Sequence, residues 1–184
     1  MRVLGISGSL RHDSHNTELL RAAATLLPSG VEFELYDGLR DIPPYDEDED
    51  KSQVAAVLRL KERIAAADAV IFATPEYNHS IPGHLKNALD WVSRPLADTP
   101  LKRKPVAVIG ASTGMFGAVW AQAELRKVLA AIGAQVIDRE LPVPMADEIV
   151  RDREKLQARG TQSLIVGILA ELLDAARPVA AAAA

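Results

Sequence analysis

Residues 8–17 combine the side chains and backbone groups that hold a phosphate in proteins. They follow a short apolar run, residues 3–6, and precede an amphipathic stretch that is typical of a helix. Gly8 lets the chain turn sharply, and the first backbone amides of a helix have no partner within it. A single helix cap would explain one donor, but not five within nine positions. The segment therefore predicts a phosphate site formed by Ser9, Arg11, Ser14, Asn16 and Thr17, in which the planar guanidinium fork of the arginine suits a phosphate dianion.

The glycine-rich fingerprint of dinucleotide-binding proteins is a competing interpretation of the same residues. Gly5 and Gly8 match two of its spaced glycines, and Asp37 ends what is predicted to be the second strand. The third position of that fingerprint requires a small residue so that helix and strand pack closely, but Arg11 stands there. The segment therefore favours a terminal phosphate monoester over a bridging diphosphate.

A second segment with unusual chemistry begins at Pro75 and runs into a helical pattern. Two prolines and a glycine make its loop stiff, and Tyr77 offers an aromatic face beside backbone amides. Rigid amides next to a flat aromatic surface suit a planar heteroaromatic ligand. Taken alone, Tyr77 could be a residue on the rim of a site, and Lys86 and Trp91 are interpreted as ordinary helix face and core.

A third segment, residues 110–117, contains three glycines and two hydroxyl side chains, with little bulk before Phe116. A structural turn needs one glycine, so three of them predict that a ligand lies close to the backbone amides. The four histidines and the acidic residues form no spacing that would hold a metal, and no nucleophile motif is present.

The three segments are positioned by alternating strands and helices. Short continuous apolar runs predict strands over residues 3–6, 31–36, 69–74, 106–111 and 135–137, and helical patterns cover residues 17–27, 53–67, 83–92, 117–132 and 153–176. This alternation predicts an α/β fold: a flavodoxin-like, doubly wound, three-layer arrangement with a five-stranded parallel sheet in the order 2-1-3-4-5. Loops after strands 1, 3 and 4 then converge at the carboxyl edge of the sheet.

Composition limits the classes of function. The 184 residues suffice for one domain over residues 1–177, and the alanine-rich residues 178–184 are predicted to form a disordered tail. The formal net charge is −4, with acidic residues gathered at 46–50 in a predicted exposed loop, so no nucleic-acid partner is expected. No cysteine is present, hence any redox chemistry must come from a cofactor. Neither a signal peptide nor a membrane span is apparent, which predicts a cytoplasmic protein.

With these three segments assembled, the chain resembles the NADPH-dependent FMN reductase family, which includes FMN, quinone, azo-dye and chromate reductases. The resemblance spans about residues 1–150. It rests on Gly8-Ser9-Leu10-Arg11 with Ser14 and Asn16, on Pro75-Glu76-Tyr77-Asn78 with the residues that follow to Trp91, and on Gly110-Ala111-Ser112 with Gly114.

The resemblance implies a site and a reaction. The residues of the first segment would hold the FMN phosphate. Pro75, Glu76, Tyr77 and Asn78 would hold the isoalloxazine edge, largely through backbone groups, and Ser112, Thr113 and Gly114 would close the other side. NADPH or NADH would pass hydride to the flavin, which would then reduce a small-molecule acceptor, with Tyr77 lining the substrate face and no side chain acting as acid or base.

The resemblance also implies a homodimer or homotetramer, with Trp91, Phe116 and Trp120 as apolar contacts between subunits; the alternative is that all three fill the core. Two other functions stay open. The first is a flavodoxin-like electron carrier, although such proteins are usually far more acidic around the flavin. The second is a non-catalytic flavin-binding module. The sequence does not distinguish free flavin, quinone, azo compound and chromate as acceptors, nor NADPH from NADH.

Overall fold

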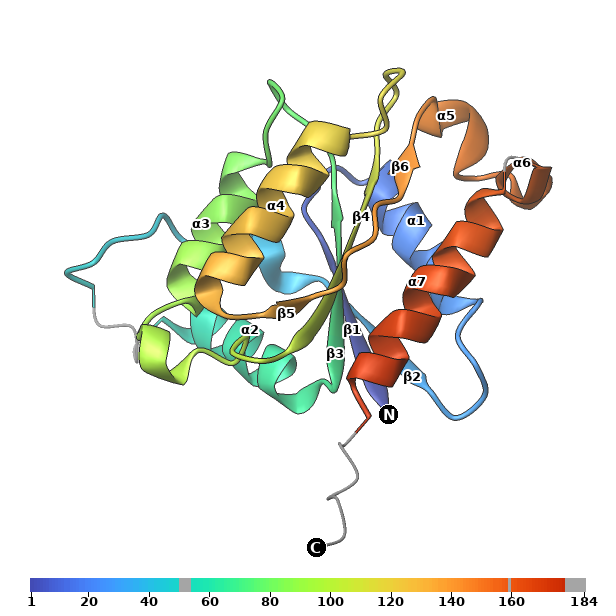
Figure 1. Ribbon diagram of the computed structural model, residues 1–184. Helices are drawn as coiled ribbons and strands as arrows, with labels where there is room; N and C mark the ends of the chain where they lie inside the picture. Colours follow the sequence, from blue (N-terminus) through green and yellow to red (C-terminus); the bar gives the residue numbers. More distant parts are fainter. Residues whose placement is uncertain (50–53, 159, 178–184) are drawn as a thin grey trace, which may run out of the picture.

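The computed structural model describes residues 1–49, 54–158 and 160–177, and its centre is a parallel β-sheet (Figure 1). The strands β1 (Arg2–Ser7), β2 (Glu32–Tyr36), β3 (Ala69–Thr74), β4 (Pro105–Ala111) and β5 (Gln135–Val136) pair in the order β2-β1-β3-β4-β5. The flavodoxin-like order predicted from the sequence is thus confirmed. The three inner strands read as nearly continuous apolar runs because helices cover both of their faces.

The last position of the sheet is divided between two short strands. β5 pairs with the first residues of β4, at Pro105 and Val106, and β6 (Pro142–Val143) pairs with its last residues, at Gly110 and Ala111. The sequence predicts one strand here and misses β6. A two-residue strand carries too short a pattern to be distinguished from a loop.

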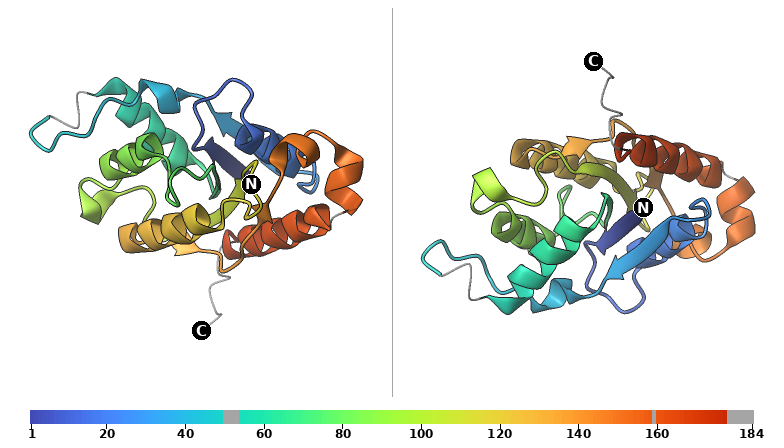
Figure 2. Two further views of the ribbon diagram at one scale, coloured as in Figure 1. Left: turned by 90° about the horizontal axis from the view of Figure 1, so that it is seen from above. Right: turned by 90° about the horizontal axis from the view of Figure 1, so that it is seen from below.

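Helices form a layer on each face of the sheet, as Figures 1 and 2 show. On one side lie α2 (Ala55–Ala66), α3 (Gly83–Val92) and α4 (Val119–Ile132), whose apolar faces share one buried cluster with β1, β3 and β4. On the other side α1 (His15–Ala24) and α7 (Thr161–Ala175) share a second cluster. The short 3-10 helices η1 (Gly38–Asp41) and η2 (Leu96–Asp98) and the helix α5 (Ala146–Ile149) lie in the connections.

The predicted C-terminal helix, residues 153–176, is divided in the structure. α6 (Arg153–Ala158) ends before α7 begins, and Gly160 precedes α7 with a φ of +72°. A left-handed residue cannot continue an α-helix, and glycine adopts this conformation with little strain. The prediction of one unbroken helix is wrong for this reason.

Two other predicted helix starts move by two residues. α1 begins at His15 rather than at residue 17, because Ser14 is its N-cap. α4 begins at Val119 rather than at residue 117, because Gly117 and Ala118 both have positive φ.

Trp91 is fully buried in the cluster beneath α3, where its ring Nε1 donates to the carbonyl of Pro43 at 2.9 Å. Its assignment as a contact between subunits is therefore wrong. The predicted exposed loop is confirmed for residues 46–49, whereas residue 50, the start of the predicted second helix at residue 53 and the tail 178–184 lie outside the described residues. None of the described helices is long and apolar enough to cross a membrane.

Candidate functional site

A pocket opens at the carboxyl edge of the sheet, where the loops after β1, β3 and β4 meet; Figure 2, left, looks onto this edge. Its space, including the part open to solvent, is about 410 Å³. Nine of the predicted site residues line it, and His15 and Ala111 are additions that the sequence did not identify: the lining is Ser9, Arg11, Ser14, His15, Asn16, Pro75, Glu76, Tyr77, Ala111, Ser112 and Thr113. Of the other predicted residues, Thr17 lines a neighbouring hollow, and Asn78 and Gly114 flank the pocket in the chain.

The first loop presents unpaired backbone donors to this pocket. Ser14 caps α1: its buried Oγ accepts from the amide of Thr17 at 3.2 Å. Within the described parts of the chain, the amides of His15 and Asn16 have no hydrogen-bond partner, as expected in the first turn of a helix. These donors and the positive end of the helix dipole make the start of α1 suitable for an anion.

Asn16 has a structural role that the sequence did not show. Its side chain is only 3 % exposed, and its amide forms two hydrogen bonds with the backbone of Ala111 at the end of β4. Nδ2 donates to the carbonyl and Oδ1 accepts from the amide, both at 2.9 Å. The side chain therefore ties the first loop to the third, and its backbone amide is the group left for a ligand.

The second loop is stiffened by a tight turn as well as by its prolines. Tyr77 and Ser80 exchange two backbone hydrogen bonds, at 3.0 and 3.1 Å, across Asn78 and His79. These two residues have φ of 54° and 61°, the left-handed pair that a type I′ turn requires. The turn holds the Tyr77 side chain half-exposed at the pocket.

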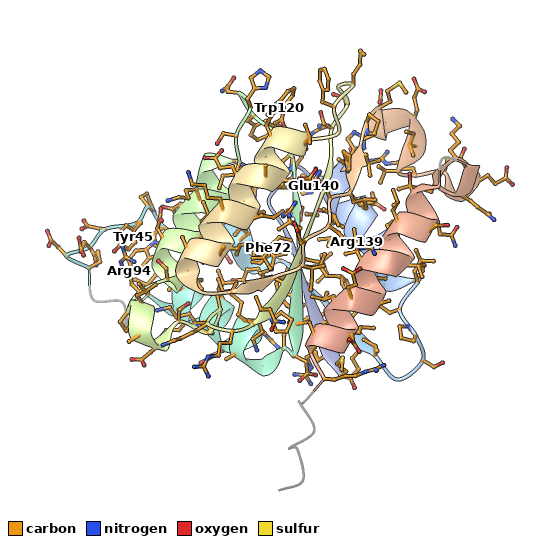
Figure 3. All side chains as sticks on the ribbon, viewed as in Figure 1. Tyr45, Phe72, Arg94, Trp120, Arg139 and Glu140 are labelled. Carbon is orange, nitrogen blue, oxygen red and sulfur yellow. The ribbon has the colours of Figure 1, made fainter. Side chains whose placement is uncertain are left out.

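Glu76 connects the second loop to α4. One carboxylate oxygen, Oε2, accepts from the amides of Trp120 and Ala121 at 3.0 and 3.1 Å, and the other lies 3.7 Å from His79. Ala118, the residue at the N-cap position of α4, supplies no capping side chain, so Glu76 satisfies the start of that helix instead. Figure 3 shows Trp120 at this end of α4, where its ring meets that of His79 edge-on at 4.6 Å.

Two of the three glycines in the third loop are required by the fold. A Cβ on Gly110 would lie 2.9 Å from the Gln122 side chain, and one on Gly117 would lie 2.5 Å from the backbone of Val143. The inference that all three glycines serve a ligand is therefore wrong. Gly114 is not required by the fold, because a Cβ at this position would meet only Ser112 Oγ, at 3.5 Å.

Some amides of the third loop are already engaged in hydrogen bonds. The Ser112 amide donates to the carbonyl of Val143 at 3.1 Å, and that of Gly114 donates to Ser112 Oγ at 3.1 Å. Among the described residues nothing accepts from the amide of Thr113. The amides of Met115, Phe116 and Gly117 likewise have no acceptor in the described parts of the chain, so a ligand that approaches this loop would find several backbone donors around the open position at Gly114.

The comparisons with known proteins agree with this geometry. The family model described as NADPH-dependent FMN reductase matches residues 1–148. An NAD(P)H-dependent FMN reductase of Pseudomonas aeruginosa is 51 % identical over 130 residues, covering 70 % of this chain and 69 % of the relative. A quinone reductase of Escherichia coli is 40 % identical over 141 residues, covering 76 % and 74 %.

The chain belongs to the NADPH-dependent FMN reductase family. Among solved structures it is similar to FerB, an NAD(P)H:acceptor oxidoreductase from Paracoccus denitrificans, with a TM-score of 0.79 and 36 % identity over 94 % of this chain and 97 % of that one. The protein is therefore an oxidoreductase that uses FMN and NAD(P)H. Membership of this family decides against the electron carrier and the non-catalytic module.

The pocket fits FMN as the cofactor. Arg11 forms no ion pair within the described chain, which leaves its guanidinium for a phosphate. The buried Nδ1 of His15 in the pocket wall also has no partner there. An unsatisfied buried polar atom is unfavourable, so a ligand rich in acceptors and donors suits this wall. No cluster of three or more His, Asp or Glu side chains among the described residues forms a metal site.

Proposed function

We propose that this enzyme reduces quinones, using FMN held in the pocket described above and NAD(P)H as the electron donor. The observation that carries the choice of acceptor is the apolar rim of the site. Tyr77 lines the pocket, and Met115, Phe116 and Trp120 lie exposed on the loop and helix that follow β4. Flat, apolar side chains of this kind favour a planar, weakly polar acceptor over an anion such as chromate. The E. coli relative named quinone reductase supports the same choice.

In this proposal each loop holds one part of FMN. Ser9, Arg11 and Ser14 bind the phosphate together with the amides of His15 and Asn16, and Thr17 supports them from the adjacent hollow through its 2.9 Å hydrogen bond to Ser7. The backbone of Pro75, Glu76, Tyr77 and Asn78 holds the isoalloxazine edge, and Ser112, Thr113 and Gly114 close the opposite side.

When bound, FMN would supply the redox chemistry, which is hydride transfer from NAD(P)H to the acceptor. The chain's own residues position the reactants. In this proposal the type I′ turn would keep Tyr77 on the open face of the flavin, and the Thr113 amide would donate to the pyrimidine edge, where negative charge grows on reduction. No side chain is assigned as a general acid or base.

Initial rates of the holoenzyme with NADPH and NADH test the acceptor. A benzoquinone is expected to show a kcat/KM at least about tenfold above that of free FMN, an azo dye or chromate. Tyr77→Ala is expected to raise KM for the quinone about tenfold, because an aromatic contact contributes about 1 kcal/mol or more, with FMN affinity nearly unchanged. Tyr77→Phe, the control, keeps the ring and should keep KM.

A preference for chromate, azo dye or free FMN over every quinone would contradict the proposed acceptor. Failure to oxidise either nicotinamide with any acceptor would contradict the proposed function as a whole.

We also propose that the enzyme is a homodimer or homotetramer in which Phe116 and Trp120 contact the partner chain, so that the interface lies at the rim of the site. Phe116 is 60 % exposed, and its ring lies 4.9 Å from that of Trp120, so the two form a continuous apolar surface. Light scattering at micromolar concentration should give a mass of two or four chains, and Phe116→Asp should lower it. The matched change Leu58→Asp, at an exposed position of α2, should leave the mass unchanged. A monomeric wild-type mass would contradict the proposal.

The proposed place of action is the cytoplasm. The electron donor is NAD(P)H, and an enzyme that consumes it must share a compartment with the reactions that regenerate it. Its other partners in this proposal are small-molecule acceptors, and the acidic net charge of −4 offers no attraction for nucleic acid.

A further inference from the structure

A second hollow lies on the other side of the first loop from the FMN pocket. It is bounded by that loop, α1, the end of β2 and η1, and its space, including the part open to solvent, is about 850 Å³. Ser9 and Arg11 line both cavities, so a molecule in the hollow lies one loop away from the flavin site. The proposed binding of FMN uses Ser9, Arg11 and Thr17 from this lining and leaves the side formed by Arg21, Tyr36, Asp37 and Arg40 without a role.

The lining of the hollow contains more positively than negatively charged side chains. Arg11, Arg21 and Arg40 reach it from three different elements, whereas Asp37 is the one carboxylate in its lining. Arg21 pairs with Glu18, and Arg40 donates to the carbonyl of Leu10, which holds its guanidinium at the hollow. A concentration of positive charge in a concave surface of a chain with net charge −4 favours an anion at this place.

Neutral hydrogen-bonding groups complete the wall. Ser7 is buried, and its Oγ accepts from Thr17. Tyr36 is only 8 % exposed and lines the hollow, yet its hydroxyl has no partner among the described residues. Burial raises the pKa of Tyr36; Arg59 and Arg63 lower it and Asp41 and Asp37 raise it to smaller extents, so the hydroxyl remains a donor at neutral pH. Hydroxyl groups and three arginines in the lining of one hollow indicate a ligand with phosphate or ribose oxygens.

We propose that this hollow binds the adenosine 2′-phosphate of NADPH and thereby selects NADPH over NADH. The proposal rests on the use of NAD(P)H in the proposed function. A 2′-phosphate is a terminal monoester dianion, which suits the guanidinium forks of Arg21 and Arg40. Asp37 lies at the end of β2, three positions before Arg40, where its carboxylate repels the same phosphate. The two side chains therefore have opposite effects on the choice of nicotinamide.

Kinetics with both nicotinamides test the assignment. Arg40→Ala and Arg21→Ala are each expected to lower the ratio of kcat/KM for NADPH to that for NADH about tenfold, the loss of one hydrogen bond to a charged group. Asp37→Asn is expected to raise this ratio about threefold. FMN content and kcat/KM for NADH should stay within about twofold of wild type in all three variants.

Arg59→Ala is the matched control. Arg59 lies near Tyr36 but outside the hollow and pairs with Asp41 at 3.2 Å. Arg59→Ala removes the same charge as the other two arginine substitutions. An equal fall in the NADPH-to-NADH ratio of kcat/KM in this variant would assign the effect to long-range charge and overturn the proposal. An unchanged ratio in both Arg21→Ala and Arg40→Ala would also overturn it.

Calorimetry of the FMN-loaded enzyme with adenosine 2′,5′-bisphosphate and with AMP identifies the phosphate. The bisphosphate should bind at least tenfold more tightly than AMP and lose this advantage in Arg40→Ala. Equal binding of the two, with an unchanged nicotinamide ratio, would make the hollow a site for a free nucleotide and overturn its role in NADPH selection. If the enzyme oxidises neither nicotinamide but binds the bisphosphate as expected, the proposed function fails while the anion site stands.

Discussion

Replacing Gly114 by valine is expected to abolish FMN binding, with an affinity loss above about a hundredfold, while the fold stays intact. A Cβ at this position meets only Ser112 Oγ, at 3.5 Å, and the φ of Gly114 is not in the left-handed region. The fold therefore accepts a side chain here. A branched side chain would stand beside the unpaired Thr113 amide, in the space that the isoalloxazine ring occupies in the proposed complex. Flavin titration and circular dichroism measure the two effects separately.

Gly117→Val provides the contrast. Gly117 has a φ of +59°, and its Cβ would lie 2.5 Å from the backbone nitrogen of Val143. This variant should lose the folded state as well as FMN. A Gly114→Val protein that binds FMN with wild-type affinity would mean that the third loop does not touch the ring, and the roles given to Ser112, Thr113 and Gly114 would be withdrawn.

Replacing Asn16 by leucine, which has a similar volume, is expected to lower the free energy of unfolding by about 3–5 kcal/mol. The variant loses two buried hydrogen bonds and leaves both backbone groups of Ala111 without these partners. An unsatisfied buried group is unfavourable by about 1–3 kcal/mol, more than the net contribution of the bond itself. For a chain of this length the melting temperature should fall by about 10 °C. Urea unfolding and thermal melting of the apoprotein measure the change without FMN.

Thr17→Val is the control for Asn16→Leu. It removes one hydrogen bond, from Thr17 Oγ1 to Ser7 Oγ at 2.9 Å, at a half-buried position one residue further along α1. Its expected loss is about 1 kcal/mol. If Asn16→Leu were no more destabilising than this control, the tie between α1 and β4 would not contribute to stability as the structure indicates.

The identity and order of the main elements follow from local signals in the sequence. β3 and β4 are continuous apolar runs, and the helices between strands show a helical period, so the alternation and the parallel order could be predicted. Parallel strands end at one edge of the sheet, which is why the convergence of the three loops could be predicted before any contact was known. The ends of the helices are harder to predict from the sequence, because the apolar pattern does not show that Gly160 and Ala118 adopt left-handed conformations.

Local patterns in the sequence are sufficient to predict the kind of fold, the family and which loops meet. Which polar groups remain for a ligand depends on contacts in the folded chain. The sequence predicts Asn16 as a phosphate donor, but its side chain forms hydrogen bonds with Ala111, 95 positions away. The Glu76 carboxylate accepts from the amide of Trp120, 44 positions further on, at the start of α4. A Cβ at Gly110 would clash with Gln122, and one at Gly117 would clash with Val143, so Gly114 is the glycine of this loop that has space beside it. These pairings depend on contacts between distant segments. The spacing of residues along the chain does not show which donors and acceptors are already used in such contacts.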